Sequence, residues 1–198
     1  MTTDEVALDE EIIEDDEGSG DPPVAAGGQG TASTWHRPSV GRWVLFTAIA
    51  IGIVALDQVS KAMVMSALPN AGDYLVILGE WLGIVHGRNS GALFGLLPQS
   101  AGAFAIVSFG VVALIVWYHA RAGRGIVTTI ALGLLLGGAI GNLLDRLNYG
   151  AVLDFIDMGI GGWRFFTYNL ADAAITTAII MLIAMAVFPR IAEWGTDA

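Results

Sequence analysis

Four apolar stretches, each close to the length that crosses a lipid bilayer, constrain the fold of this 198-residue chain more than any other feature. They cover approximately residues 43–66, 101–118, 125–144 and 170–188. An α-helix rises about 1.5 Å per residue, so about 20 apolar residues cross the ~30 Å hydrocarbon core of a bilayer. Hydrophobic residues make up 55 % of the chain and charged residues only 14 %, which is unusual for a soluble domain. The sequence therefore predicts an all-α membrane protein with four transmembrane helices.

The residues before the first apolar stretch have a different composition. Ten of the nineteen acidic residues lie between Asp4 and Asp21, and a segment rich in glycine, proline and serine follows. Such a segment cannot bury enough apolar surface to offset the entropy of ordering it, so we expect residues 1–40 to be a disordered acidic tail. Its acidic start also differs from the basic start of a secretory signal peptide. Acidic and basic residues are equal in number from residue 35 onward, so the net charge of −10 describes the tail and indicates no nucleic-acid partner.

Basic residues indicate how the four expected helices are oriented. Five arginines fall on one side of them: Arg37, Arg42, Arg121, Arg124 and Arg190. By the positive-inside rule this side is cytoplasmic, together with both termini and a short C-terminal tail of residues 191–198. Residues 67–100 and 145–169 then form two longer outer loops. The first contains two β-prone runs, YLVIL and WLGIV, separated by a Gly-Glu turn, and we expect a small β-hairpin or cradle there.

Charged residues interrupt this apolar pattern. Six of them lie in or beside the expected helices, or in the loop that joins the last two: Asp57, Lys61, Asp145, Arg146, Asp154 and Asp172. Charge at membrane depth is costly, so its default interpretation is functional. The spacing of Gly138, Asn142 and Asp145 places them on one face of the third helix. The expected topology brings all of these residues, with Asn89 and Asn169, to the outer face of the membrane.

The residue types favour carboxylate chemistry at this face. The chain has no cysteine, and its three histidines, His36, His86 and His119, are too few for a metal site. A Ser-His-Asp relay at the outer face would have to use His86, and no strained nucleophile turn accompanies that residue. Two carboxyl groups held close together share a proton, so one can activate a water while the other donates to a carbonyl. Position alone would pair Asp145 with Asp172. A transporter or ion pathway, and a structural or assembly protein, remain alternatives, although a transporter is expected to place its charges near the midplane.

Five short motifs occur in a fixed order along the chain: Asp57-Gln-Val-Ser-Lys61, Asn89-Ser-Gly91-Ala-Leu-Phe94, Gly137-Gly-Ala-Ile-Gly141-Asn142-Leu-Leu-Asp145-Arg146, Val152-Leu-Asp154-Phe155 and Asn169-Leu-Ala171-Asp172. Over residues 40–190 this order resembles the lipoprotein signal peptidase family, also called signal peptidase II. The resemblance implies that residues 41–190 form a four-helix transmembrane peptidase domain in the bacterial cytoplasmic membrane, with its active site at the outer face. It also implies an aspartic endopeptidase that cleaves diacylglyceryl-modified prolipoproteins before the lipid-carrying cysteine, without a metal or other cofactor.

The resemblance assigns roles to individual residues. It implies that Asp154 and Asp172 are the catalytic pair. The substrate-binding residues that it implies are Asn89, Gly91, Asn142, Arg146 and Asn169, and the supporting residues are Asp57, Lys61, Gly138 and Asp145. The implied partners are prolipoproteins, membrane lipid and inhibitors of the globomycin type, and the implied enzyme is monomeric.

Simpler roles are open for several of these residues. Asn142 and Asn169 could serve only to join helices by hydrogen bonds. The pair Asp57 and Lys61 of the first helix could be purely structural. Asp145 could be an ion-pair partner of Arg146 at a helix end, and Arg146 could reach out to the interface. Without the resemblance, Asp154 would be interpreted as an ordinary loop carboxylate. The chain departs from the family pattern at Leu93, where a small residue is usual, and at Tyr168, where phenylalanine is usual.

Overall fold

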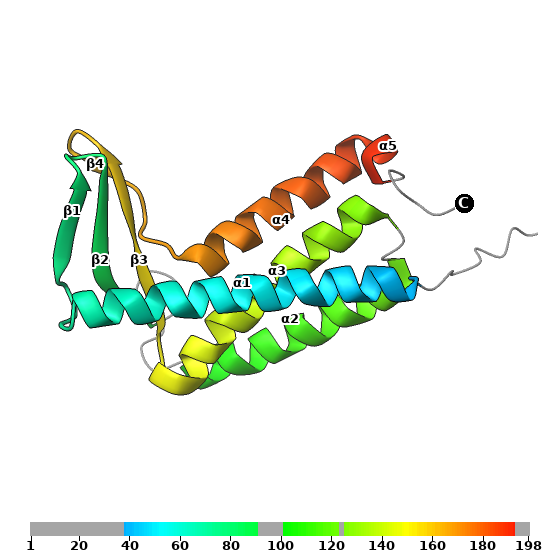
Figure 1. Ribbon diagram of the computed structural model, residues 1–198, viewed down its shortest axis with the longest axis horizontal. Coiled ribbons are helices and arrows are strands. Elements are labelled where there is room, and N and C mark those ends of the chain that lie inside the picture. The colour runs from blue at the N-terminus through cyan, green and yellow to red at the C-terminus, as the bar shows by residue number, and fades with distance from the viewer. Residues whose placement is uncertain (1–37, 91–100, 123–124, 193–198) are drawn as a thin grey trace, which may run out of the picture. The chain divides into compact units, whose positions relative to one another are not determined.

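The computed structural model describes residues 38–90, 101–122 and 125–192, within a unit that covers Trp35–Ala198. The tails expected at residues 1–40 and 191–198 lie almost wholly outside these ranges, so the disorder of the first and the cytoplasmic location of both stay predictions. The helices are α1 (Val40–Ala67), α2 (Ala101–Ala122), α3 (Ile126–Tyr149), α4 (Leu170–Val187) and α5 (Pro189–Ala192). The strands are β1 (Tyr74–Leu78), β2 (Leu82–Asn89), β3 (Val152–Ile160) and β4 (Trp163–Arg164) (Figure 1).

Three of the four expected spans are long and apolar enough to cross a membrane: α1, α3 and α4. The apolar stretch described in α2, Ala105–Arg121, is at the short end of the range for a membrane-spanning helix, so the fourth crossing stays a prediction. The central helix is α3, and α1, α2 and α4 all pack against it. It continues past the boundary expected at residue 144 and ends before Gly150, whose φ of 68° lies in the left-handed region that glycine adopts without a steric penalty.

Glycines let the outer helices approach α3 closely. A Cβ atom added at Gly137 would lie 2.8 Å from the carbonyl oxygen of Ala50 in α1. A Cβ atom added at Gly138 would lie 2.5 Å from the carbonyl oxygen of Ala171 in α4. Small residues have this role in membrane helices, where the lipid supplies no hydrophobic drive for association. The two adjacent glycines therefore set the distances from α3 to two different neighbours.

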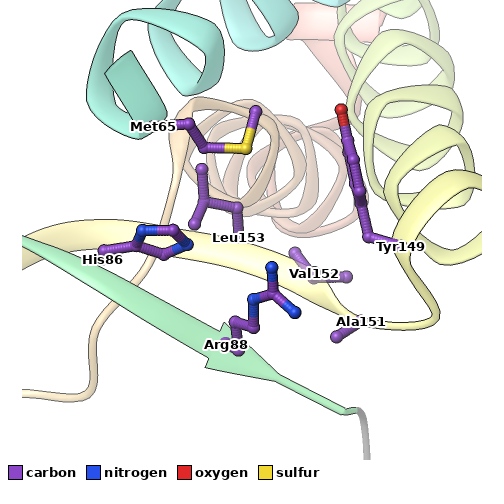
Figure 2. Close-up of a pocket in the computed structure, with 7 residues that line it drawn as sticks. All are labelled: Met65, His86, Arg88, Tyr149, Ala151, Val152 and Leu153. Carbon is purple, nitrogen blue, oxygen red and sulfur yellow. The ribbon is translucent and has the colours of Figure 1, made fainter. Parts of the chain in front are cut away.

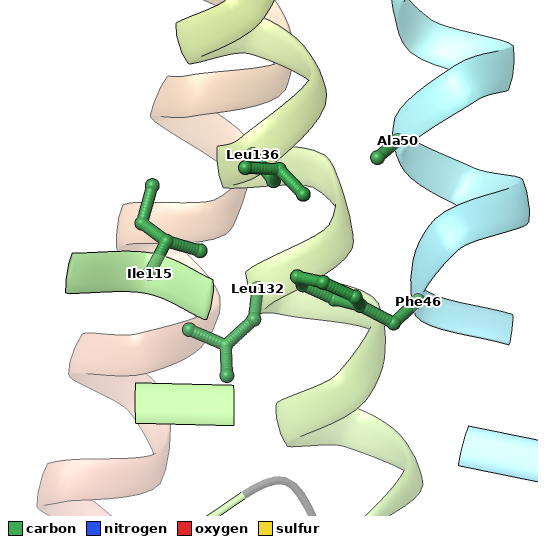
Figure 3. Packing of buried hydrophobic residues seen from close by; sticks show 5 residues of the cluster. All are labelled: Phe46, Ala50, Ile115, Leu132 and Leu136. Atoms are coloured by element: carbon green, nitrogen blue, oxygen red, sulfur yellow. The ribbon is translucent and has the colours of Figure 1, made fainter. Parts of the chain in front are cut away.

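The apolar core lies at the end of the helices that is distant from the sheet. It consists of five buried side chains from α1, α2 and α3: Phe46, Ala50, Ile115, Leu132 and Leu136 (Figure 3). The buried side chains Asp57 and Lys61 of α1 and Asn142 and Asp145 of α3 lie further along toward the sheet. The buried carboxylates and the lysine of the described helices are therefore at the end next to the sheet, whereas His119, Thr128 and Thr129 are the buried polar side chains near the apolar core.

The sheet extends the hairpin that the sequence predicts. Strands β1 and β2 are antiparallel, as expected, and β3 and β4 continue the order β1-β2-β3-β4. The sequence predicts no strand in the second outer connection, residues 145–169, but β3 lies there and pairs with β2, which places Gly87 opposite Asp154 and Arg88 opposite Leu153. The free edge of β2 supplies hydrogen-bond partners for β3, and this pairing joins segments more than sixty residues apart. The second outer connection is therefore a strand that carries Asp154.

Candidate active site

The first turn of α4 holds one carboxylate at the helix N-terminus. Asn169 is the N-cap, and its side-chain oxygen accepts a hydrogen bond from the backbone N–H of Asp172 at 2.9 Å. In return the carboxylate Oδ2 of Asp172 accepts from the backbone N–H of Asn169 at 3.3 Å. This reciprocal arrangement is a capping box, which satisfies two N–H groups that a helix start would leave unpaired. The sequence Asn-x-x-Asp therefore both begins the helix and orients the Asp172 carboxylate.

The second carboxylate lies on β3 and is held by two amides. Asp154 is only 3 % exposed. Its Oδ2 accepts a hydrogen bond from Asn89 at 3.0 Å, and its Oδ1 accepts from Asn169 at 2.9 Å. Burial raises the pKa of Asp154 to about 6, and the negative charge of Asp172 adds to the rise, while the bonds from Asn89 and Asn169 oppose it.

One asparagine links the two carboxylates. The side chain of Asn169, which is fully buried, donates to Asp154, and its backbone N–H donates to Asp172. From α3, Asn142 donates to Oδ1 of Asp172 at 2.7 Å and accepts from the Asn169 amide at 3.2 Å. Both amides thus join helices, as the simpler interpretation proposed, and both also contact the predicted catalytic pair.

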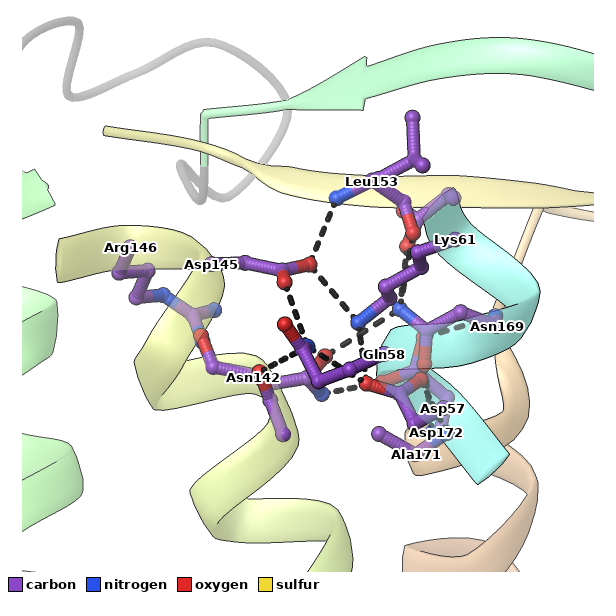
Figure 4. A network of polar contacts seen from close by, with 12 residues as sticks. Asp57, Gln58, Lys61, Asn142, Asp145, Arg146, Leu153, Asn169, Ala171 and Asp172 are labelled. Atoms are coloured by element: carbon purple, nitrogen blue, oxygen red, sulfur yellow. Dashed lines mark hydrogen bonds and ion pairs between the residues drawn. The ribbon is translucent and has the colours of Figure 1, made fainter. Parts of the chain in front are cut away.

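A buried group of charges lies beside the pair. The ammonium of Lys61 is 2.7 Å from the carboxylate of Asp57 and 2.7 Å from that of Asp145, and none of the three side chains is more than 2 % exposed. Gln58 donates to Asp145 at 2.9 Å and to Asp57 at 3.2 Å (Figure 4). Asp145 is therefore an ion-pair partner of Lys61 on α1. We name the four residues Asp57, Gln58, Lys61 and Asp145 the charged brace.

The charged brace also holds the backbone next to each predicted catalytic residue. Asp57 accepts a hydrogen bond from the N–H of Ala171 at 3.0 Å, and Ala171 precedes Asp172. Asp145 accepts from the N–H of Leu153 at 3.0 Å, and Leu153 precedes Asp154. Since Lys61 binds both carboxylates, it connects the two backbone anchors. Asp145 is engaged by Lys61 and by β3, which argues against the pairing of Asp145 with Asp172 that position alone would choose.

The remaining predicted residues have more varied positions. Arg146 is half-buried on α3, and its guanidinium donates to the carbonyl of Asn142 at 3.1 Å, so it lies next to the site. Gly138 supports the site through its close approach to α4. Gly91 lies outside the described residues. Sequence reasoning missed Gln58, although a polar side chain next to Asp57 in an apolar helix was a usable signal.

Comparisons with known proteins agree with the motif order. The family model for signal peptidase (SPase) II matches residues 49–188. Lipoprotein signal peptidases of Burkholderia vietnamiensis and Burkholderia ambifaria are 35 % and 34 % identical to this chain over 156 residues, which is 77 % of this chain and 93 % of each relative.

Solved structures agree as well. A bacterial membrane enzyme determined in meso at 2.3 Å superposes with a TM-score of 0.69 at 28 % identity, covering 82 % of this chain and 97 % of the other. A second such enzyme, determined at 1.9 Å, superposes with a TM-score of 0.67 at 30 % identity, covering 78 % and 97 %. The chain therefore belongs to the signal peptidase II family.

Proposed function

We propose that this protein is a membrane-bound aspartic endopeptidase that removes the signal peptide from diacylglyceryl-modified prolipoproteins, cutting before the lipid-modified cysteine. Family membership supports prolipoproteins as substrates. Asp154 and Asp172 would act together as acid and base, and Asn89, Gly91, Asn142, Arg146 and Asn169 would contact the substrate. Neither a metal nor another cofactor takes part in the proposed reaction.

The observation that carries the proposal is the shared contact of Asn169 with both carboxylates. A residue that bonds Asp154 through its side chain and Asp172 through its backbone fixes the two acids against each other. Carboxylates held in this way exchange one proton as a unit. We propose that the ionised member takes a proton from a water, which attacks the scissile carbonyl while the protonated member donates to the carbonyl oxygen. The raised pKa of Asp154 suits a group that holds the shared proton.

The position of the polar residues argues against an ion pathway. The charged brace and the predicted catalytic pair lie toward the sheet. At the other end of the described helices Phe46, Leu132 and Leu136 form an apolar core, and no carboxylate or lysine of the described residues is buried there. A continuous polar path through the described helices would have to cross this core. The arrangement suits chemistry at one membrane face.

The sheet fits the outer membrane surface, where the active site would lie. All five side chains of β1 are exposed, and four of them are aliphatic. Trp81, Trp163, Phe165 and Phe166 are exposed as well, with Phe166 83 % exposed. Exposed apolar side chains of this kind are stable in the headgroup layer of a bilayer. We propose the cytoplasmic membrane of a bacterium as the location, with both termini in the cytoplasm.

A cleavage assay on matched substrates tests the proposal. Purified enzyme in detergent, with a chelator present, is given a diacylglyceryl prolipoprotein or the same prolipoprotein with an unmodified cysteine, and the new N-terminus is mapped by mass spectrometry. We expect cleavage of the lipidated substrate alone, immediately before the modified cysteine. Equal cleavage of both substrates, a cut elsewhere, or loss of activity with the chelator would contradict the proposal.

A further inference from the structure

A small pocket lies against the face of the β2–β3 pair that is opposite Asn89. It is lined by Met65 near the end of α1, by His86 and Arg88 of β2, by Tyr149 at the end of α3, and by Ala151, Val152 and Leu153, and its volume is about 230 Å³ when the open space at its mouth is counted (Figure 2). Side chains alternate between the faces of a strand, so Arg88 points away from the face on which its neighbour Asn89 reaches Asp154. This pocket is therefore separate from the predicted catalytic pair.

The floor of the pocket contains an unpaired buried acceptor. His86 is only 4 % exposed, and its Nδ1 lies 2.7 Å from the carbonyl oxygen of Leu68, the residue that ends α1. A carbonyl only accepts, so Nδ1 carries the proton, and Nε2 of the neutral ring is an acceptor. This Nε2 is buried and has no hydrogen-bond partner in the described part of the chain. Buried polar atoms are almost always paired, so a donor is missing from the floor of the pocket.

An exposed arginine lies at the mouth of the same pocket. Arg88 is exposed, its guanidinium points into the space beside the His86 ring (Figure 2), and it makes no hydrogen bond or ion pair with the described residues. A guanidinium is a preferred partner of phosphate groups because its N–H groups match the spacing of two phosphate oxygens. The mouth thus offers a site for an anion, a short distance above an acceptor that needs a donor.

The place of the pocket in the fold suggests what supplies both groups. It lies where α1 and α3 end and the sheet begins, which is the depth of the headgroup layer if these helices span the bilayer. Met65, Leu153 and the ring of Tyr149 give it an apolar wall. The pocket as a whole has room for one group the size of a water molecule, such as a hydroxyl or a primary ammonium, so a larger group would have to lie outside its mouth.

We propose that this pocket binds the headgroup of a membrane phospholipid that carries an N–H or O–H donor beside its phosphodiester. The phosphodiester pairs with Arg88, and the hydroxyl or ammonium donates to Nε2 of His86. Phosphatidylethanolamine and phosphatidylglycerol have this chemistry, whereas phosphatidylcholine has the phosphodiester but no donor. Headgroup binding here does not depend on what the enzyme cleaves.

The experiment measures which lipids the full-length protein retains. Native mass spectrometry of the detergent-purified protein is performed with phosphatidylethanolamine and phosphatidylcholine of identical acyl chains in competition. We expect the wild type to prefer phosphatidylethanolamine by about tenfold, the effect of one hydrogen bond that involves a charged group. Phosphatidylglycerol should also outcompete phosphatidylcholine.

Three variants assign the selectivity to the pocket. His86→Asn keeps a side-chain N–H near the Leu68 carbonyl but lacks the second ring nitrogen, so it should bind both lipids equally. Arg88→Gln should weaken the binding of both lipids, and Arg88→Lys should restore part of it. Cleavage activity should persist in all three variants, which would show that they fold.

Several outcomes would overturn the proposal. Equal retention of the two lipids by the wild type would mean that a water alone satisfies Nε2. A preference unchanged in both His86→Asn and Arg88→Gln would place lipid selectivity elsewhere. Displacement of every lipid by inorganic phosphate, without any preference among headgroups, would indicate a site for a free anion. If His86→Asn does not fold, the two arginine variants still test the proposal. Weaker lipid binding in Arg88→Gln with partial recovery in Arg88→Lys would support it, and unchanged lipid binding in both would overturn it.

Discussion

Replacing Lys61 with methionine should destabilise the protein strongly. The ammonium of Lys61 is the cation that lies 2.7 Å from both Asp57 and Asp145 in the charged brace, and these two carboxylates are 0 % and 1 % exposed. Methionine has a similar length and fills the same space but leaves two buried negative charges side by side. Removing one partner of a buried ion pair costs about 3–5 kcal/mol, most of it the penalty of the charge that is left unpaired.

Thermal unfolding in detergent at neutral pH measures this effect. For a chain of this size, 1 kcal/mol corresponds to a shift of roughly 2–4 °C, so Lys61→Met should lower Tm by about 6–20 °C. Arg190→Met is the matched control, because it removes an exposed cation, and its effect should stay within about 0.5 kcal/mol.

A neutral brace should recover most of the lost stability. The triple variant Asp57→Asn, Lys61→Met, Asp145→Asn removes all three charges but keeps side-chain oxygens that can accept from the N–H groups of Ala171 and Leu153. We expect its Tm to return more than half of the way to that of the wild type. A Tm of Lys61→Met within 3 °C of the wild type, or a triple variant less stable than the single one, would refute the interpretation of the brace.

Three further predictions concern the site and its support. Gly138→Ala places a Cβ 2.5 Å from the carbonyl oxygen of Ala171, so it should separate α3 from α4 and lower both Tm and cleavage activity. Gly110→Ala is the control: no atom lies within 4 Å of the added Cβ, so it should lower neither. Asn169→Ala removes an N-cap and the link between the two carboxylates, so it should cost about 1–2 kcal/mol of stability and reduce kcat/KM more than about a hundredfold. The control Asn70→Ala, in an exposed turn, should change neither stability nor kcat/KM. Since the pKa of Asp154 is about 6, the free enzyme should lose the shared proton above that pH, and kcat/KM should fall about tenfold per pH unit; a flat profile between about pH 5 and 8 would contradict the shared proton.

The helices and the site residues could be predicted because their signals are local. An apolar run reports a span directly, and the observed bounds of α4 differ from the expected 170–188 by one residue. The polar residues of the helices stand out against this background, and the expected topology brings them to the same end of the helices. The motif order then separates Asp154 from Asp145, a choice that length, charge and periodicity leave open.

The strand β3 and the partners of the brace could not be predicted in this way. The strand forms because β2 offers it an edge, and a pairing between Arg88 and Leu153 leaves no mark in the local sequence around either residue. The same holds for Lys61 and Asp145, which are eighty-four positions apart, and for the bond between Asn89 and Asp154. The raised pKa of Asp154 is a product of its burial in the folded chain and has no counterpart in the sequence.

The central claim is that Asp154 and Asp172 act as one unit, and a double-variant cycle tests it most directly. Values of kcat/KM are measured on a lipidated prolipoprotein for Asp154→Asn, Asp172→Asn and the double variant, with Asp157→Asn, a buried aspartate of the same strand, as the control. Groups that act as a unit are strongly non-additive, so we expect each single variant to lose at least about a thousandfold and the double variant to lose no more. Losses that multiply in the double variant, or more than about a tenth of wild-type activity in either single variant, would contradict a shared catalytic pair.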